Sequence, residues 1–125
     1  MLFKCLSKSL NEKLSKLELV VKNAGSNSLY KNIKIDVINS LAYITSVNAK
    51  VCVIERLEVE SDSNFSFLVE ASSFIRFVKK QKNGEIKIVL SDKKDSITIY
   101  YASGEYSCPA FDVNTFPMVY NIPDG

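Results

Sequence analysis

Apolar and polar residues alternate along most of the chain, which is the pattern of strands with one buried face. Ile33, Ile35 and Val37, for example, are separated by charged residues. The same pattern, bounded by polar or glycine-containing segments, predicts further strands. They span residues 2–6, 41–47, 51–59, 65–70, 86–90, 97–101 and 105–108. Most of the chain is therefore expected to form antiparallel sheet.

Two segments instead repeat their apolar residues every three or four positions, as amphipathic helices do. The first spans residues 7–23, and its apolar stripe is formed by Leu10, Leu14, Leu17 and Val21. Ser9 and Glu12 match a capping box, in which the serine caps the helix and the glutamate bonds back to the serine amide. We therefore expect Ser9 to be the N-cap of this helix.

The second helix is predicted over residues 71–83, directly after a strand. Its apolar face is formed by Phe74, Ile75 and Val78. Ser72 or Ser73 is expected to cap its start. Asn83 and Gly84 supply a left-handed residue of the kind that commonly ends a helix.

The order of elements repeats, because each half reads as a strand, a helix and then three strands. The halves span residues 1–60 and 65–109. Such a pseudo-repeat predicts an α+β fold in which both helices pack side by side on one face of a curved antiparallel sheet. We expect a single domain over residues 1–120, with residues 121–125 as a tail or the start of a linker.

The net charge of +2 hides an uneven distribution. The two helical segments carry eight basic residues against two acidic ones, a formal charge of +6, so the remainder carries −4. If both helices present their polar sides in the same direction, one surface collects seven basic side chains. These are Lys13, Lys16, Lys22, Arg76, Lys79, Lys80 and Lys82.

Double-stranded DNA is the anionic partner that we expect for this surface, because lysine and arginine contacts to phosphate need no sequence readout. The pattern contains no zinc finger, no recognition helix and no aromatic stacking platform for single strands. The alternative is that these side chains only solvate the outer sides of the helices. The absence of any acid from residues 71–83 favours the DNA interpretation, since a solvating surface normally mixes both signs.

Catalysis is not expected from this composition. The chain has no histidine, which excludes the commonest general base, the Ser-His and Cys-His pairs and histidine metal sites. The three cysteines, Cys5, Cys52 and Cys108, lack metal-ligand spacing and are interpreted as small reduced core residues of a cytoplasmic protein. No glycine-rich phosphate loop is present. We therefore expect no catalytic residue, no metal and no cofactor.

No membrane partner is expected either. No apolar run approaches the roughly 20 residues that cross a bilayer. The first ten residues lack the apolar block and cleavage site of a secretory signal.

Four segments, taken in order, resemble a known family. They are Asn-Ile-Lys-Ile-Asp-Val at 32–37, Leu-Ala-Tyr-Ile-Thr-Ser at 41–46, Phe-Leu-Val-Glu-Ala-Ser-Ser-Phe at 67–74 and the ending Pro109-Ala110…Phe116-Pro117. Their order and spacing are similar to the N-terminal domain of the bacterial DNA polymerase III beta subunit, the sliding clamp. The resemblance extends from Phe3 to Pro117.

The resemblance implies a DNA-clamp-like fold, with two helices lining a central hole and sheets forming the outside of a ring around duplex DNA. In that family a subunit has three such domains, and the first meets the third domain of a neighbouring subunit. Carried over by position, the subunit interface is the last strand with the second helix, and Lys79 or Lys80 lies nearby. Its strand residues are Glu105, Tyr106, Ser107 and Cys108.

Three features of the chain differ from the family pattern. Only one domain is present, so we expect either a domain of a longer protein or a freestanding relative. The loop after the first helix reads Gly-Ser-Asn-Ser at 25–28, where the family often has a basic residue. Polymerase and loader peptides bind the later domains, so no such pocket is expected here.

Two hypotheses of function follow. The first is a non-catalytic clamp domain that supports polymerase processivity in DNA replication, with its basic helices facing duplex phosphates. The second is a clamp-like protein-interaction module that pairs through the edge at residues 105–108 and does not itself bind DNA. An enzymatic function is the third and least favoured hypothesis.

Overall fold

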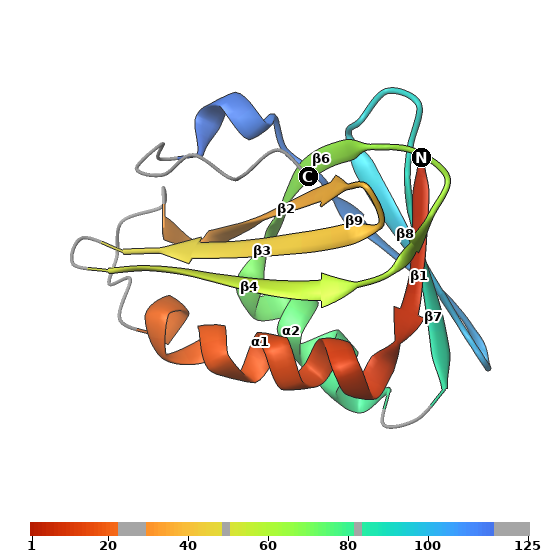
Figure 1. The fold of residues 1–125 in the computed structure, drawn as a ribbon, viewed down its shortest axis with the longest axis horizontal. Coiled ribbons are helices and arrows are strands. Elements are labelled where there is room, and N and C mark those ends of the chain that lie inside the picture. Colours follow the sequence, from red (N-terminus) through yellow and green to blue (C-terminus); the bar gives the residue numbers. More distant parts are fainter. Residues whose placement is uncertain (23–29, 49–50, 82–83, 117–125) are drawn as a thin grey trace.

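The computed structural model describes residues 1–22, 30–48, 51–81 and 84–116 (Figure 1). In the first half a strand leads into a helix, and further strands follow. These are β1 (Leu2–Leu6), α1 (Ser7–Lys22), β2 (Asn32–Ile38), β3 (Leu41–Val47), β4 (Cys52–Glu58) and the short β5 (Glu60–Ser61). The second half repeats this order and ends in a 3-10 turn. Its elements are β6 (Phe65–Glu70), α2 (Ala71–Lys80), β7 (Glu85–Leu90), β8 (Ser96–Tyr101), β9 (Gly104–Pro109) and η2 (Val113–Thr115).

The α+β class and the pseudo-repeat are confirmed, but the strands form two antiparallel sheets. One has the order β5-β1-β7-β8-β9 and the other β4-β3-β2-β6. Each half therefore gives its first strand to the other half, because β1 pairs with β7 and β6 pairs with β2. Sequence alternation could not predict this exchange, since it reports which face of a strand is buried and not which strand lies beside it.

Both helices lie on the same side of the strands, as predicted (Figure 1). The α1 side chains of Leu10, Leu14 and Leu17 are almost fully buried, and α1 contacts β3 and β4. On α2 the buried side chains are Ala71, Phe74, Ile75 and Val78. These stripes join the inward faces of both sheets in one core, which supplies the main driving force for folding.

The capping predictions were wrong at both helix starts. Helix α1 begins at Ser7, so Ser9 lies inside its first turn, and the Ser7 amide donates to the Gly84 carbonyl at 2.9 Å. Helix α2 begins at Ala71 with the extended Glu70 as its N-cap, and the Ser73 hydroxyl donates to the Glu70 carboxylate at 2.8 Å. In both places a strand runs directly into the helix, so the helix starts earlier than the serines suggest.

The end of α2 is closer to the prediction. The helix ends at Lys80, and the amide of its C-cap residue, Gln81, donates to the Val78 carbonyl at 3.0 Å. Gly84 has a φ of +103°, in the left-handed region that glycine adopts without strain. Asn83 lies outside the described residues.

The segment after β9 folds back over the outer side of the four-stranded sheet. Phe111 forms a bridge with Leu68 of β6, and the two residues exchange backbone hydrogen bonds of 3.0 and 3.4 Å. Phe116 is buried in a small second cluster with Val47 and Leu68. This segment therefore occupies the outer edge of β6. The longer strands left at sheet edges are β4 and β9.

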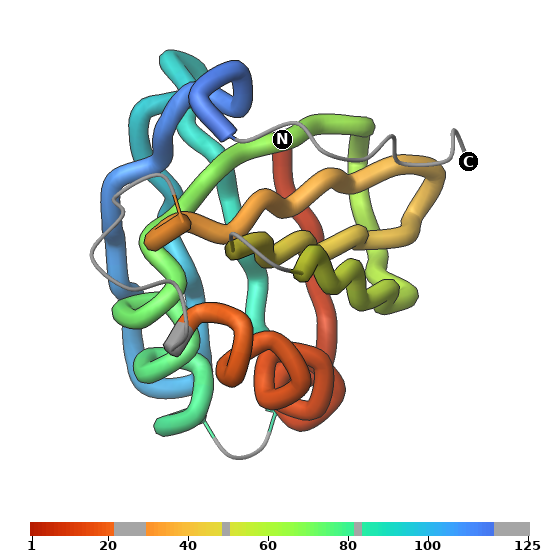
Figure 2. The backbone as a smooth tube through the Cα atoms, turned by 90° about the vertical axis from the view of Figure 1, so that its left-hand side faces the viewer, coloured from red at the N-terminus to blue at the C-terminus, as the bar shows by residue number. Residues whose placement is uncertain are grey.

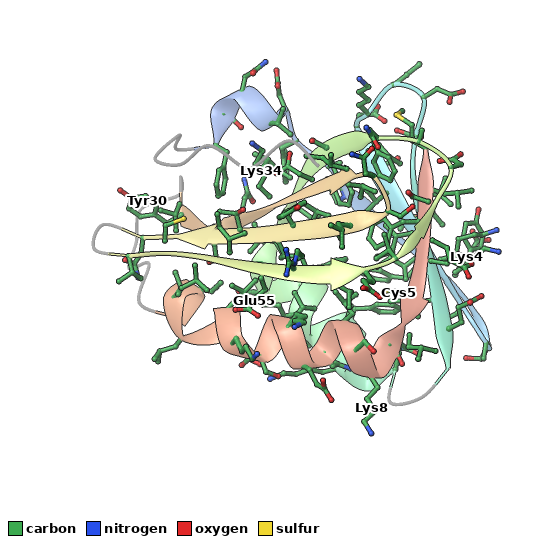
Figure 3. The ribbon with its side chains drawn as sticks, viewed as in Figure 1. Lys4, Cys5, Lys8, Tyr30, Lys34 and Glu55 are labelled. Carbon is green, nitrogen blue, oxygen red and sulfur yellow. The ribbon has the colours of Figure 1, made fainter. Side chains whose placement is uncertain are left out.

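Cys5 lies in β1 among core residues, and Figure 3 labels it there. Burial, and secondarily the charge of Glu85, raise the pKa of its thiol from 9.0 to about 12. The raised pKa favours the thiol in the folded state. Its contribution to stability is therefore present below pH 9 and is lost as the pH rises toward 12.

We expect iodoacetamide to alkylate Cys5 at mildly alkaline pH at least about tenfold more slowly in the folded chain than in the urea-unfolded chain, because only the thiolate reacts. Mass spectrometry of the Cys5 peptide measures both rates. Cys52 provides an internal comparison, since its thiol is only partly buried. Equal rates for Cys5 in the two states would contradict the assignment.

Candidate nucleic-acid interface

The candidate interface is built on the pair of helices. They lie side by side, as Figures 1 and 2 both show, and the Asn11 side-chain amide of α1 donates to the Val78 carbonyl of α2 at 3.0 Å. Glu18 and Val21 of α1 line a cavity together with residues of α2. The two helices therefore present neighbouring polar surfaces, which is the arrangement that the charge analysis required.

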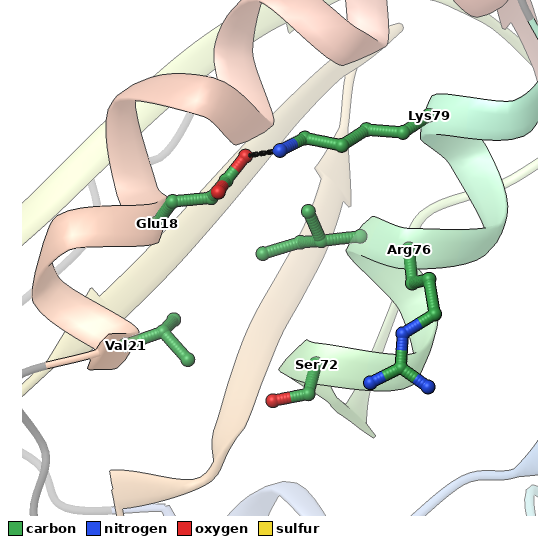
Figure 4. Close-up of a pocket in the computed structure, with 6 residues that line it drawn as sticks. Glu18, Val21, Ser72, Arg76 and Lys79 are labelled. Carbon is green, nitrogen blue, oxygen red and sulfur yellow. Dashed lines mark ion pairs between the residues drawn. The ribbon is translucent and has the colours of Figure 1, made fainter.

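The basic residues of α2 fall into two classes. The side chains of Arg76 and Lys80 are exposed and have no ion-pair partner among the described residues. The ammonium of Lys79 is instead ion-paired with the carboxylate of Glu18 on α1 (Figure 4). Arg76 and Lys80 are the α2 cations that are directly available to an external anion.

Two basic residues of α1, Lys13 and Lys16, lie beside β4. The Lys16 ammonium lies 3.7 Å from the Glu55 carboxylate of that strand, whose position Figure 3 marks. Lys13 is half-buried and lines an open cavity of about 700 Å³ with Arg56 and Glu58 of β4. The predicted basic set is thus divided into a group between the helices and a group beside β4.

Two predicted DNA-binding residues cannot be placed. Lys82 lies outside the described residues, and the same holds for the side chain of Lys22 at the end of α1. Sequence reasoning also missed two contributors. Glu18 holds Lys79, and Arg56 adds a cation beside Lys13. Arg56 could have been noticed in the sequence, because it is the one basic residue in a strand that is otherwise rich in glutamate.

The cavity between the helices has a volume of about 250 Å³ (Figure 4). Its lining combines two apolar and four polar or charged side chains. They are Glu18 and Val21 of α1 with Ser72, Ile75, Arg76 and Lys79 of α2. We call this the inter-helix cavity.

A second candidate surface is the free edge of β9, which contains all four residues predicted for the subunit interface. The ring of Tyr106 stacks on Phe77 of α2, with centroids 4.4 Å apart and planes 12° apart. Tyr101 meets the same Phe77 ring edge-on at 5.3 Å. The last strand and the second helix are therefore joined through aromatic contacts. Burial, and then the charge of Glu70, raise the pKa of the Cys108 thiol on this strand.

The backbone of β9 presents hydrogen-bonding groups outward. The Ala110 amide donates to the Asp95 carbonyl at 3.0 Å, and bonded and non-bonded pairs alternate along an antiparallel ladder. By this alternation the backbone amides of Tyr106 and Cys108 bond to β8. The backbone amides of Glu105 and Ser107 point away from β8. Pro109 occupies the next position whose backbone nitrogen faces outward. Proline has no N–H, so no hydrogen bond to β8 is lost there.

Other kinds of site are not indicated by the described parts of the chain. Within residues 1–22, 30–48, 51–81 and 84–116, no three histidine, cysteine or acidic side chains are grouped so that they could hold a metal ion. Among the described helices, none has the length and apolar character that crossing a membrane requires.

Solved structures with the same fold include beta subunits and beta clamps of bacterial DNA polymerases. The beta subunit of Streptococcus pyogenes DNA polymerase superposes with a TM-score of 0.88 at 16% identity, covering 98% of this chain and 33% of that one. Caulobacter crescentus pol III beta gives 0.87 at 15% identity, covering 96% and 33%. The Helicobacter pylori beta clamp bound to a DNA ligase peptide gives 0.86 at 19% identity, covering 98% and 34%.

The chain thus spans about a third of the length of these structures. No curated protein matches it in sequence. The sequence model of the DNA polymerase III beta subunit N-terminal domain, however, matches residues 1–121, nearly the whole chain. The resemblance noted in the sequence is therefore confirmed, and the chain belongs to the family of DNA polymerase III beta subunit N-terminal domains.

Proposed function

We propose that this chain is a non-catalytic domain of a DNA sliding clamp, which supports polymerase processivity in replication by facing the phosphate backbone of duplex DNA with its paired helices. The observation that carries this proposal is the pairing of α1 with α2, which leaves Arg76 and Lys80 exposed and without an ion-pair partner among the described residues. Contacts of this kind are independent of sequence and weaken steeply with salt.

The proposed partners follow from the family and from the size of the chain. A single domain cannot surround a duplex, so other clamp domains or subunits would complete the ring. The Helicobacter pylori clamp is described as bound to a DNA ligase peptide, and that chain is about three times as long. We propose that polymerase and loader contacts are made through such additional domains, and that the protein acts in the cytoplasm without a cofactor.

The test is a double charge reversal on α2. Arg76→Glu combined with Lys80→Glu should weaken duplex binding by about tenfold at low salt and reduce the slope of log K against log salt by about two, since each lost phosphate contact removes about 0.9. Fluorescence anisotropy of a labelled duplex at several salt concentrations measures both quantities.

The matched control is Lys93→Glu combined with Lys94→Glu. These two exposed lysines lie in the turn between β7 and β8, away from the helices, and the control makes the same change in net charge. Its binding should stay within about twofold of the parent. If both double variants weaken binding equally, net charge alone acts, and the paired helices are not the DNA surface.

A second candidate function rests on the outward backbone groups of β9 and on the Tyr106–Phe77 stack beside them. In this case the chain is a clamp-like interaction module that pairs with another chain and does not itself bind DNA. Experiment can distinguish the two functions, because the variant with both Arg76→Glu and Lys80→Glu changes the proposed DNA surface and leaves β9 intact.

A further inference from the structure

The inter-helix cavity has a donor-rich wall formed by one face of α2. Ser72 and Arg76 are four positions apart and Lys79 follows three positions later, so the three side chains lie along the same side of the helix. Val21 and Ile75 contribute apolar surface to the lining. Ser72, Arg76 and Lys79 are all exposed, so an anion can reach these donors directly from solvent.

The two cations that line this wall, Arg76 and Lys79, differ in their ion pairing. Lys79 reaches across to Glu18, whereas Arg76 turns toward the Ser72 end of the cavity (Figure 4). No ion pair involves Arg76 within the described parts of the chain. The Arg76 fork and the Ser72 hydroxyl both line this end of the cavity, and this pair of donors suits a tetrahedral oxyanion.

The size of the cavity restricts the ligand. Its volume of about 250 Å³ is below the roughly 300–1,000 Å³ of pockets for drug-sized molecules. It corresponds to the liquid volume of roughly eight water molecules at about 30 Å³ each, which is room for one phosphate group with part of its hydration.

We propose that the inter-helix cavity is a binding site for a single phosphate group of the DNA backbone, held by the Arg76 guanidinium and the Ser72 hydroxyl, and that Glu18 is an internal competitor of that phosphate. The proposal rests on the proposed function and refines it from a diffuse basic surface to a defined contact. The guanidinium donates two parallel hydrogen bonds to phosphate oxygens, and the Ser72 hydroxyl donates a third.

Glu18 opposes binding in two ways. Its carboxylate lines the same cavity and repels a second anion, and it also holds Lys79, which would otherwise add to the positive charge there. Removing the Glu18 charge should therefore strengthen DNA binding. This opposite sign distinguishes a defined site from a general loss of stability, which would weaken binding in every variant.

The experiment uses the full chain and a short labelled duplex, with the Arg76 Nε–Hε resonance followed by NMR alongside the binding curve. Arg76→Lys keeps the charge but removes the fork, and Ser72→Ala removes one donor. Each should weaken binding about threefold, whereas Glu18→Gln should strengthen it about threefold, as expected for single charge-assisted hydrogen bonds near a surface. Lys93→Gln serves as the remote control, with a change below about twofold.

Failure of the site and failure of the proposed function give different results. If the parent chain shows no salt-dependent duplex binding, the proposed function fails and the site fails with it. If the parent binds but Arg76→Lys and Ser72→Ala bind equally well, only the defined site is overturned. An Arg76 resonance that shifts with inorganic phosphate but not with the duplex would also overturn it, because the site would then take free phosphate and not DNA.

Discussion

Replacing Phe74 by alanine is expected to lower the free energy of unfolding by about 3–5 kcal/mol, the usual cost of emptying a buried aromatic site. Phe74 is fully buried on α2 and belongs to the core shared by both sheets and both helices. Such a loss is a large share of the roughly 5–15 kcal/mol that stabilises a domain. Urea unfolding followed by circular dichroism measures it.

The control is Phe111→Ala, which removes the same side chain from a site that is 43% exposed. The backbone bridge to Leu68 does not depend on this side chain, so the loss should be below about 1 kcal/mol. Equal losses in the two variants would show that α2 does not connect the two sheets through Phe74. Because the residues proposed to face DNA lie on the same helix, the fraction of Phe74→Ala that unfolds should lose duplex binding.

The local structure could be predicted from the sequence because periodicity reports which side of an element is buried. Ile33, Ile35 and Val37 alternate, and all three are fully buried on β2. Phe74 and Val78 share the buried face of α2 in the same way. The pairing of β1 with β7 could not be predicted, since that contact joins residues 79 to 87 positions apart and no local pattern encodes it.

The candidate site could be predicted only in part, for a related reason. Arg76 and Lys80 are exposed because they lie off the apolar stripe of α2, and the stripe is visible in the sequence. The pairing of Lys79 with Glu18 depends on how α1 and α2 are rotated against each other, which only packing determines. The surface that the sequence predicts from seven basic side chains therefore also contains the acidic Glu18, which lines the cavity between the helices.

The β9 edge is expected to mediate self-association of the chain at high protein concentration, because unpaired strand edges pair readily with one another. Ser107→Pro removes an outward amide while leaving the bonds of Tyr106 and Cys108 to β8 in place. In a two-fold symmetric contact the lost donor counts twice. The dissociation constant should then rise by about 30- to 150-fold, from roughly 2–3 kcal/mol of lost hydrogen bonding.

Ser107→Ala is the matched control for this change. It removes the hydroxyl that lies 3.0 Å from the Thr98 hydroxyl, as the proline variant does, but it keeps the amide. Sedimentation equilibrium of the parent, Ser107→Pro and Ser107→Ala proteins compares their dissociation constants directly.

If the alanine variant dissociates as readily as the proline variant, side-chain packing on β9 holds the copies together. If association is the same in all three, the contact lies elsewhere, and the other long free strand, β4, is the next edge to vary. Only a selective effect of the proline assigns the contact to the backbone of β9.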